Sequence, residues 1–286
     1  MRSDIAIAGV GFRVRCDAGP VLPIAGAAYE QFATSLAPGS SDIQVLLDLT
    51  GKPGARPRGK LFDSGNWVLY ADEAGYRLEL GETVASWDRA VKSVTIYCGE
   101  EWRRERVGPA GVAHPLGYPL DQLLLMHHLA SRQGVLLHAA GAEIRGQGLI
   151  FPGRSGSGKT TLSANLVHHQ AIRLLSDDRM VVRKLGGTFW SFGTPWPGDA
   201  GVAVNRGAPL AAICFISHAP RNGITRLSPR AAAERLLPAA SIPWYDPAIL
   251  PDVLDSCEEL VAAVPAYELA FAPTPDVAAF LDSFVP

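Results

Sequence analysis

Apolar residues recur at every second position, or in short runs, through the first hundred residues of the chain. The segments with this pattern are VGFRVRC (10–16), DIQVLLDL (42–49), WVLYAD (67–72), YRLELG (76–81) and SVTIYCG (93–99). Stretches rich in Pro and Gly, such as GKPGARPRGK, separate them. Alternation of this kind is typical of half-buried strands. The pattern predicts an antiparallel, β-rich N-terminal region.

The pattern changes after residue 100. Residues 101–119 are polar and contain several Pro and Gly, which predicts a linker. LDQLLLMHHLASRQG (120–134) has the length and composition of a mostly buried helix, with Asp121 in its first turn, where the helix dipole favours a carboxylate. We therefore expect a β-rich domain over residues 1–110 and a second domain over residues 111–286.

Strands and helices alternate in the second half. VLLHAAGAEIR and GLIFPG predict two strands joined near Gly146, residues 159–169 predict a helix, and IRLLS predicts a strand that ends at two aspartates. Further strands are expected at MVVRKL, TFWSF and LAAICFIS, and helices at 228–237, 247–264 and 275–284. Alternation of strands and helices is characteristic of an α/β fold. The expected fold class is α/β, with C-terminal helices beside the sheet.

Composition narrows the functional classes. The chain of 286 residues is 48% hydrophobic and 19% charged, as in a globular protein with a substantial core. Its net charge of -2 offers no electrostatic basis for binding nucleic acid. No apolar run approaches the ~18 residues of a membrane span. The four cysteines show no CxxC spacing, which argues against a zinc site or a disulfide framework and fits a reducing cytoplasm.

One motif carries a specific chemistry. The sequence GxxxxGK[ST] is matched in full by Gly153, Arg154, Ser155, Gly156, Ser157, Gly158, Lys159 and Thr160, and Thr161 follows. An apolar strand precedes the motif and a helix follows it, which is the context of a phosphate-binding P-loop. Glycines let successive backbone N–H groups turn toward phosphate oxygens, and the helix dipole adds positive potential. Lys159 would reach the β- and γ-phosphates, and the Thr160 hydroxyl would ligate Mg²⁺.

Asp177 and Asp178 follow this motif after one helix and one short strand. Ligands gather at the carboxyl ends of strands in α/β sheets, so we expect both aspartates near the γ-phosphate. Two adjacent side chains point to different sides and should differ in role. One would hold Mg²⁺, and the other would accept the proton of an attacking hydroxyl, as a kinase requires. The alternative is a polar turn in which Arg179 pairs with the aspartates.

The block LLHAAGAEI…GLIFPGRSGSGKTTLSANL…IRLLSDDRM resembles the catalytic core of the HPr kinase/phosphorylase family and, more distantly, the ATP-dependent phosphoenolpyruvate carboxykinases. The resemblance covers residues 134–185, with a looser match to about 217. It implies that Asp177 is the general base for a serine hydroxyl and that His138 lies near the phosphates. FGTPWPGDAG (192–201) replaces the Leu-Glu-x-Arg-Gly-x-Gly signature of that family. The chain is more similar to the HPr-kinase-like proteins associated with lasso and other ribosomal peptides.

Two further residues complete the expected site. The resemblance implies that Asp199 helps Asp178 and Thr160 to hold Mg²⁺, because an acidic residue has that role in the corresponding region of HPr kinases. Arg206 would stabilise charge on the transferred phosphoryl group, as arginines do in phosphoryl transfer. The alternatives are a solvated aspartate in a Pro-Gly turn and a surface arginine.

The function expected from these residues is Mg²⁺-dependent transfer of the γ-phosphate of ATP to a serine hydroxyl of a peptide or protein, such as a lasso-type precursor peptide. The expected catalytic residues are Asp177, Lys159, His138 and Arg206. The rival classes are a nucleotide-binding regulatory protein without transfer and a small-molecule kinase. No nucleic acid or membrane partner is expected. Because HPr kinases assemble from several copies, the resemblance leaves a homo-oligomer open.

Overall fold

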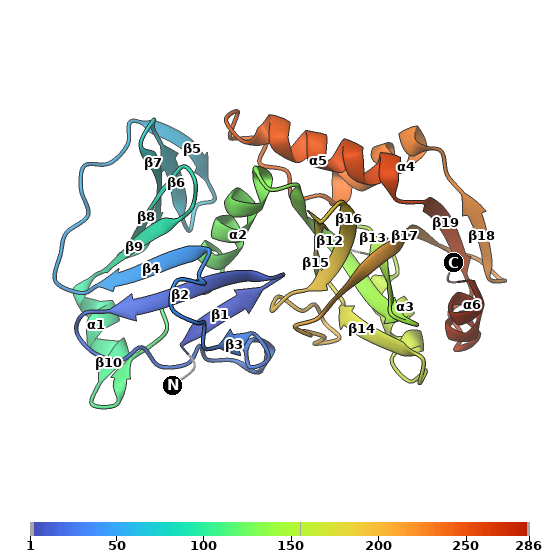
Figure 1. Cartoon of the computed structure of the whole chain (residues 1–286), viewed down its shortest axis with the longest axis horizontal. Helices are drawn as coiled ribbons and strands as arrows, with labels where there is room; N and C mark the ends of the chain where they lie inside the picture. The colour runs from blue at the N-terminus through green and yellow to red at the C-terminus, as the bar shows by residue number, and fades with distance from the viewer. Residues whose placement is uncertain (1–2, 155, 285–286) are drawn as a thin grey trace. The chain divides into compact units, whose positions relative to one another are not determined.

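The computed structural model of the chain describes residues 3–154 and 156–284 (Figure 1). The chain divides into two compact units, Met1–His128 and Leu129–Pro286. The division falls within helix α2 (Leu120–Ala130), further along the chain than residue 110, where the sequence suggests a boundary. The expected order, a β-rich N-terminal region followed by a mixed α/β region, is confirmed.

Strands β1 to β9 of the first unit form one mixed sheet in the order β3-β1-β2-β4-β9-β8-β7-β6-β5. Their bounds are β1 Asp4–Ile7, β2 Val10–Cys16, β3 Ala33–Thr34, β4 Ile43–Asp48, β5 Gly59–Asp63, β6 Val68–Ala71, β7 Gly75–Leu80, β8 Thr83–Asp88 and β9 Ser93–Cys98. The pairs β2–β4 and β4–β9 are parallel, so the expectation of a purely antiparallel region was wrong. Residues 17–42 connect β2 to β4, which is long enough for the crossover that a parallel pair needs.

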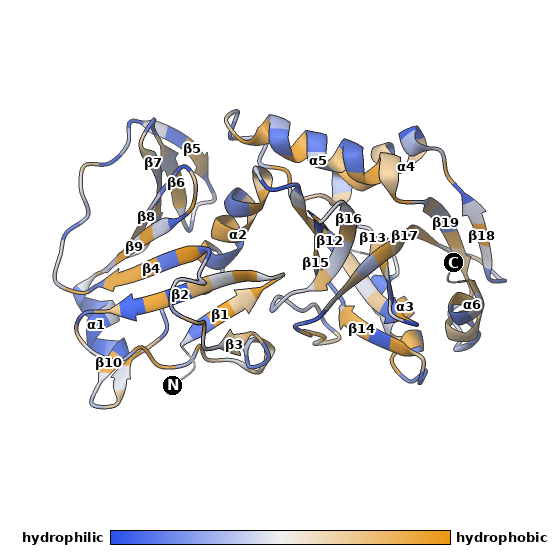
Figure 2. Cartoon of the chain, viewed as in Figure 1, coloured by the Kyte–Doolittle hydropathy of each residue, from blue (hydrophilic) through white to orange (hydrophobic). Residues whose placement is uncertain are grey.

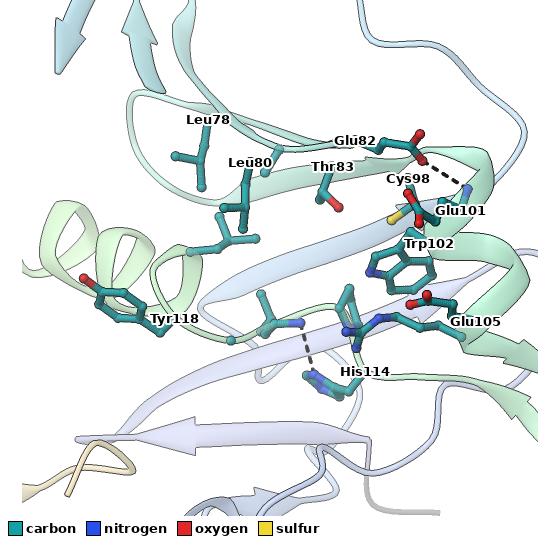
Figure 3. Close-up of a pocket in the computed structure, with 16 residues that line it drawn as sticks. Leu78, Leu80, Glu82, Thr83, Cys98, Glu101, Trp102, Glu105, His114 and Tyr118 are labelled. Carbon is teal, nitrogen blue, oxygen red and sulfur yellow. Dashed lines mark hydrogen bonds between the residues drawn. The ribbon is translucent and has the colours of Figure 1, made fainter. Parts of the chain in front are cut away.

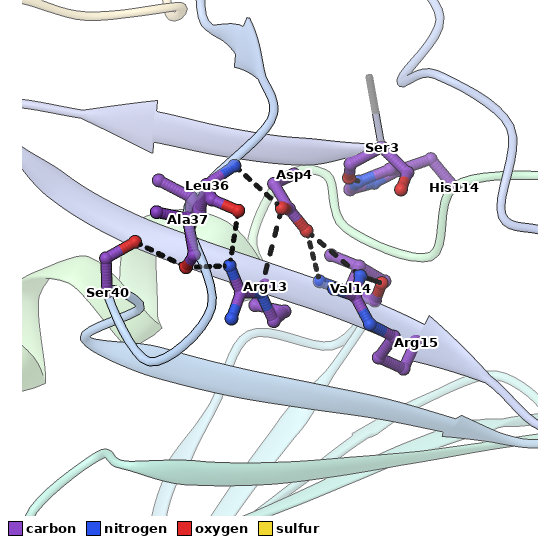
Figure 4. Close-up of polar contacts among 9 residues, drawn as sticks. All are labelled: Ser3, Asp4, Arg13, Val14, Arg15, Leu36, Ala37, Ser40 and His114. Carbon is purple, nitrogen blue, oxygen red and sulfur yellow. Dashed lines mark hydrogen bonds and ion pairs between the residues drawn. The ribbon is translucent and has the colours of Figure 1, made fainter. Parts of the chain in front are cut away.

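A polar cluster fixes one loop of this unit against the sheet (Figure 4). The buried Asp4 carboxylate accepts hydrogen bonds from the backbone N–H of Leu36 (3.0 Å) and Val14 (3.3 Å). It also pairs with Arg15 (3.2 Å), while Arg13 donates to the Leu36 carbonyl (2.6 Å). A buried carboxylate needs such partners, and these contacts hold the loop in place.

The stretch expected to be a linker contains regular structure. Residues 101–119 fall partly in helix α1 (Glu100–Arg106) and in the short pair β10 (Val107–Gly108) and β11 (Gly111–Val112). Acidic residues begin α1 and arginines end it, as the helix dipole favours. The acidic and basic ends of EEWRRER therefore stabilise a helix, although the polar composition of the segment suggested a linker.

The second unit is built around a six-strand order, β14-β12-β13-β17-β19-β18, among the described residues. The strands are β12 Gly134–Ile144, β13 Gln147–Pro152, β14 Ile172–Ser176, β17 Gly207–His218, β18 Gly223–Arg226 and β19 Ala266–Phe271. The first half of β12 also pairs with β15 (Arg179–Leu185), which continues through β16 (Thr188–Gly193) to the start of β17. The helices expected at 228–237, 247–264 and 275–284 are present, whereas strands β18 and β19 were not expected.

Helices cover both faces of this sheet, as Figure 1 shows. The helices are α3 Lys159–Leu166, α4 Pro229–Leu236, α5 Leu250–Ala263 and α6 Asp276–Phe284. Along β13, Ile150 packs with α4 and α5, whereas Leu149 and Phe151 pack with α3 and α6. This period of two places apolar side chains on both faces. Figure 2 shows the matching polar and apolar stripes of α5.

No helix of the described residues is long and apolar enough to cross a membrane.

Candidate phosphate-binding site

The sheet of the second unit brings several strand ends to one edge. Strand β13 is parallel to β17, and both β13 and β14 are antiparallel to β12, so β13, β14 and β17 run the same way. Their carboxyl ends therefore lie at one edge of the sheet, where ligands bind in α/β folds. His138, in the middle of β12, reaches the same level, because its carbonyl accepts from the N–H of Gly153 (3.1 Å).

The glycine-rich motif forms a turn between β13 and α3, as expected. Gly156 and Gly158 have φ values of 81° and 102°, a region that favours glycine. A Cβ on Gly153 would lie 2.4 Å from the Ser157 hydroxyl. Arg154 is exposed, and Ser155, also expected to bind nucleotide, lies outside the described residues. The three glycines of the motif thus allow the tight curvature of the loop.

Lys159 is folded into this turn. Its ammonium donates to the carbonyls of Gly153 (2.7 Å) and Arg154 (3.2 Å), and it lies 3.1 Å from Nε2 of His138. The side chain is buried, and burial lowers its pKa, although the Asp178 charge opposes the shift. A buried ammonium that shares loop carbonyls would gain from an anionic ligand.

His138 links this lysine to one of the two aspartates. Its Nε2 lies 2.7 Å from Oδ1 of Asp178, and the other oxygen of Asp178 pairs with Arg179 (3.2 Å). Burial, followed by the Lys159 charge, lowers the pKa of His138, so the neutral ring is favoured. A neutral imidazole nitrogen either donates or accepts. Nε2 of His138 therefore either donates to Asp178 or accepts from Lys159. A proton can be shared between His138 and Asp178.

Asp177 has different surroundings from Asp178. Its carboxylate is buried and accepts three backbone hydrogen bonds, from Gly198 (3.0 Å), Ala200 (2.7 Å) and Val202 (3.1 Å). Both oxygens are thus engaged by residues 198–202. The side chain fixes that loop beside the site, whereas the Asp178 side chain is 28% exposed.

These groups line one cavity of about 410 Å³. Its lining residues are His138, Gly156, Gly158, Lys159, Thr160, Thr161, Asp177, Asp178, Gly198, Asp199 and His218. The structure therefore brings together the residues expected to bind the nucleotide, the metal and the proton of the acceptor hydroxyl, except for Ser155, which lies outside the described residues, and for the four residues of the next paragraph. Sequence reasoning missed His218, which ends β17. The rule that ligands bind at the carboxyl ends of strands could have identified it, because His218 directly follows a predicted strand.

Arg206, Gly153, Arg154 and Ser157 are absent from this lining. The last three belong to the loop itself. Arg206 lines another cavity, and its guanidinium pairs with Glu143 through Nε and through Nη2 (2.7 Å). Hydrogen bonding to Glu143 raises the pKa of Arg206 and lowers that of Glu143. The structure thus places Arg206 in an ion pair outside the cavity.

The donor set suits a hard cation. Within the described residues, no group of three or more His, Cys, Asp or Glu side chains is arranged to hold a metal ion. Mg²⁺ does not need such a group, because it is commonly held by one or two carboxylates, water and substrate phosphates. The Thr160 hydroxyl and the carboxylates of Asp178 and Asp199 share one cavity and offer oxygen ligands only. These residues fit Mg²⁺ bound together with phosphates.

The first unit has a separate cavity of about 420 Å³ (Figure 3). Leu78, Leu80 and other apolar side chains line it, with Glu82, Glu101 and Glu105 around them. Burial raises the pKa of the Cys98 thiol in its wall to about 11. This cavity has no glycine-rich turn and no lysine among its lining residues. It therefore lacks the phosphate-binding groups found in the second unit.

Fold and site together define an α/β protein whose sheet edge carries a glycine-rich turn, a buried lysine and a His–Asp pair. The family model of the SynChlorMet cassette protein ScmC matches residues 121–272, which is 152 of the 286 residues. The chain belongs to that family.

Among solved structures, the HPr(Ser) kinase/phosphatase from Coxiella burnetii is similar over 52% of this chain and 87% of that chain. The sequence identity is 12% and the TM-score is 0.30, too low to carry an argument about function. No curated protein shows significant similarity to the chain.

Proposed function

We propose that the chain is a Mg²⁺-dependent kinase that transfers the γ-phosphate of ATP to a serine hydroxyl of a peptide or protein. The observation that carries the proposal is one cavity that contains both Lys159 of the glycine-rich turn and Asp178 paired with His138. The first supplies phosphate binding, and the second supplies a carboxylate for the hydroxyl proton. A protein that only binds nucleotide does not need the second group.

In this proposal the glycine-rich turn and Lys159 bind the phosphates. The Lys159 ammonium exchanges its two loop carbonyls for phosphate oxygens, which are stronger acceptors because they are charged. The first residues of α3, Lys159, Thr160 and Thr161, line the same cavity, and the N-terminus of a helix favours anions. Charge that develops on the transferred phosphoryl group is stabilised by these preorganised donors.

Asp178 is the proton acceptor in this proposal, in place of Asp177. Both oxygens of Asp177 already accept backbone hydrogen bonds and its side chain is buried, so its carboxylate is less open to a substrate hydroxyl than that of Asp178. Asp178 is partly exposed, and His138 at 2.7 Å can share the proton that it takes up. A general base of this kind contributes about 10² to 10⁴ in rate.

Thr160 and Asp199 would hold Mg²⁺, which when bound neutralises charge on the β- and γ-phosphates. The sequence also suggested Asp178 as a Mg²⁺ ligand, but in this proposal its carboxylate serves as the proton acceptor instead. Arg206 has no role in the proposed reaction, because its guanidinium pairs with Glu143 outside the cavity. The peptide or protein class of the acceptor follows from the resemblance, and the exposure of Asp178 suits a large acceptor.

The test is mass spectrometry of the protein incubated with Mg-ATP and a panel of acceptors. The panel contains serine peptides, the same peptides with serine replaced by alanine, and small alcohols. We expect a gain of one phosphate on serine peptides alone. Transfer to small alcohols alone would make the protein a small-molecule kinase. ATP binding without any transfer would contradict the kinase proposal and favour a regulatory role.

A further inference from the structure

His218 is a residue of the phosphate-binding cavity to which no role has yet been given. It ends β17, the parallel neighbour of β13, and its exposed ring lies 5.0 Å from the ring of Phe271 at the end of β19. Within residues 3–154 and 156–284, no hydrogen bond or ion pair engages the His218 ring. Both ring nitrogens therefore remain available to a ligand in the cavity.

The ring lies directly against the glycine-rich turn. A Cβ built on Gly158 would be only 2.9 Å from Nε2 of His218. Gly158 also has a φ of 102°, so its lack of a side chain serves both the turn and the close approach of the ring. Nε2 of His218 is thus placed beside the backbone that leads into Lys159 and the first amides of α3.

The order of strands separates this histidine from the proposed base. Asp178 follows β14 and His138 lies on β12, both on one side of β13. His218 ends β17, on the other side of β13. A polyphosphate bound over the turn at the end of β13 therefore has Asp178 and His138 on one side and His218 on the other.

We propose that His218 is a nucleotide-binding residue that donates a hydrogen bond from Nε2 to the phosphates on the side away from Asp178, those that are not transferred. The inference rests on the proposed function, since it takes the ligand of the turn to be a nucleoside triphosphate. Phe271 supports the ring in this position. The ligand chemistry is a polyphosphate, which ATP and inorganic tripolyphosphate share.

The test is titration calorimetry with Mg-ATP, tripolyphosphate and adenosine. His218→Phe keeps a ring against Phe271 and removes both nitrogens. His218→Gln removes the ring but keeps an amide donor near the position of Nε2. His168→Phe is the matched control, because His168 is an exposed histidine of the same unit outside the cavity. Thermal unfolding of each variant confirms that it is folded.

We expect His218→Phe to weaken ATP and tripolyphosphate binding about tenfold, the effect of one hydrogen bond to a charged group. His218→Gln should retain most of the affinity, and His168→Phe should match the unmodified protein. Unchanged polyphosphate affinity in His218→Phe would overturn the inference. So would weaker ATP binding with unchanged tripolyphosphate binding, which would assign the ring to the nucleoside. If the unmodified protein binds neither ligand, the proposed function itself fails.

Discussion

Replacing Asp177 by asparagine separates an anchoring role from a catalytic one. The carboxylate accepts from Gly198 and Val202 at Oδ1 and from Ala200 at Oδ2. An asparagine oxygen can keep the first two bonds, but its NH₂ group would then face the N–H of Ala200, so a charge-assisted bond is lost in a buried place. A bond of that kind stabilises by about 1.5–3 kcal/mol. We therefore expect Asp177→Asn to lower the free energy of unfolding by about 3 kcal/mol.

Thermal and urea unfolding measure this effect. For a unit of this size, about 3 kcal/mol corresponds to a fall in Tm of about 6–12 °C. The matched control is Asp199→Asn, in an exposed residue of the same loop, which should change stability by less than about 0.5 kcal/mol. An Asp177→Asn variant as stable as the unmodified protein, yet unable to transfer phosphate, would refute the anchoring role and restore Asp177 as the base.

Three further predictions follow from the site and the core. Gly158→Ala should lower ATP affinity more than Gly156→Ala in calorimetry, since both have positive φ but only a Cβ on Gly158 meets His218; equal effects would contradict this. Lys159→Met should weaken ATP binding by about tenfold to a hundredfold without loss of thermal stability, because a buried ammonium is removed; a large fall in Tm would argue for a structural role. Burial lowers the pKa of His114 to about 4 from 6.5, so the stability that the neutral ring supplies is present above pH 6.5 and lost as the pH falls to 4. Urea unfolding should show a lower free energy of unfolding at pH 4.5 than at pH 7.5, and His114 should contribute up to about 3 kcal/mol of the difference. The His114→Gln variant should lack this contribution. An identical pH dependence in the variant would refute the assignment.

Local signals in the sequence predicted the turn well. The glycines, Lys159 and Thr160 lie next to one another in the chain, and the strand before them and the helix after them follow from short-range patterns. The positions of His138 and the two aspartates could also be predicted, because each lies a short distance in sequence from the turn, on or just after a neighbouring strand. For these residues, sequence spacing and spatial proximity nearly coincide.

Contacts between distant segments were beyond such reasoning. The roles of Asp177 and Asp178 depend on backbone N–H groups of residues 198–202, which no spacing rule connects to the aspartates. Arg206 was expected in the site because its ion pair with Glu143, 63 residues earlier, is invisible in the sequence. The parallel pairing of β4 with β9 likewise depends on a long connection, which folds as the antiparallel strands β5 to β8 of the same sheet.

The most direct test of the account is the rate of phosphoserine formation on a peptide with Mg-ATP, followed by mass spectrometry for the unmodified protein and for Asp178→Asn. The account predicts transfer by the unmodified protein and a rate lower by about 10² to 10⁴ in the variant, with ATP affinity and Tm retained. Transfer at an unchanged rate in Asp178→Asn would contradict the central claim that this carboxylate accepts the hydroxyl proton.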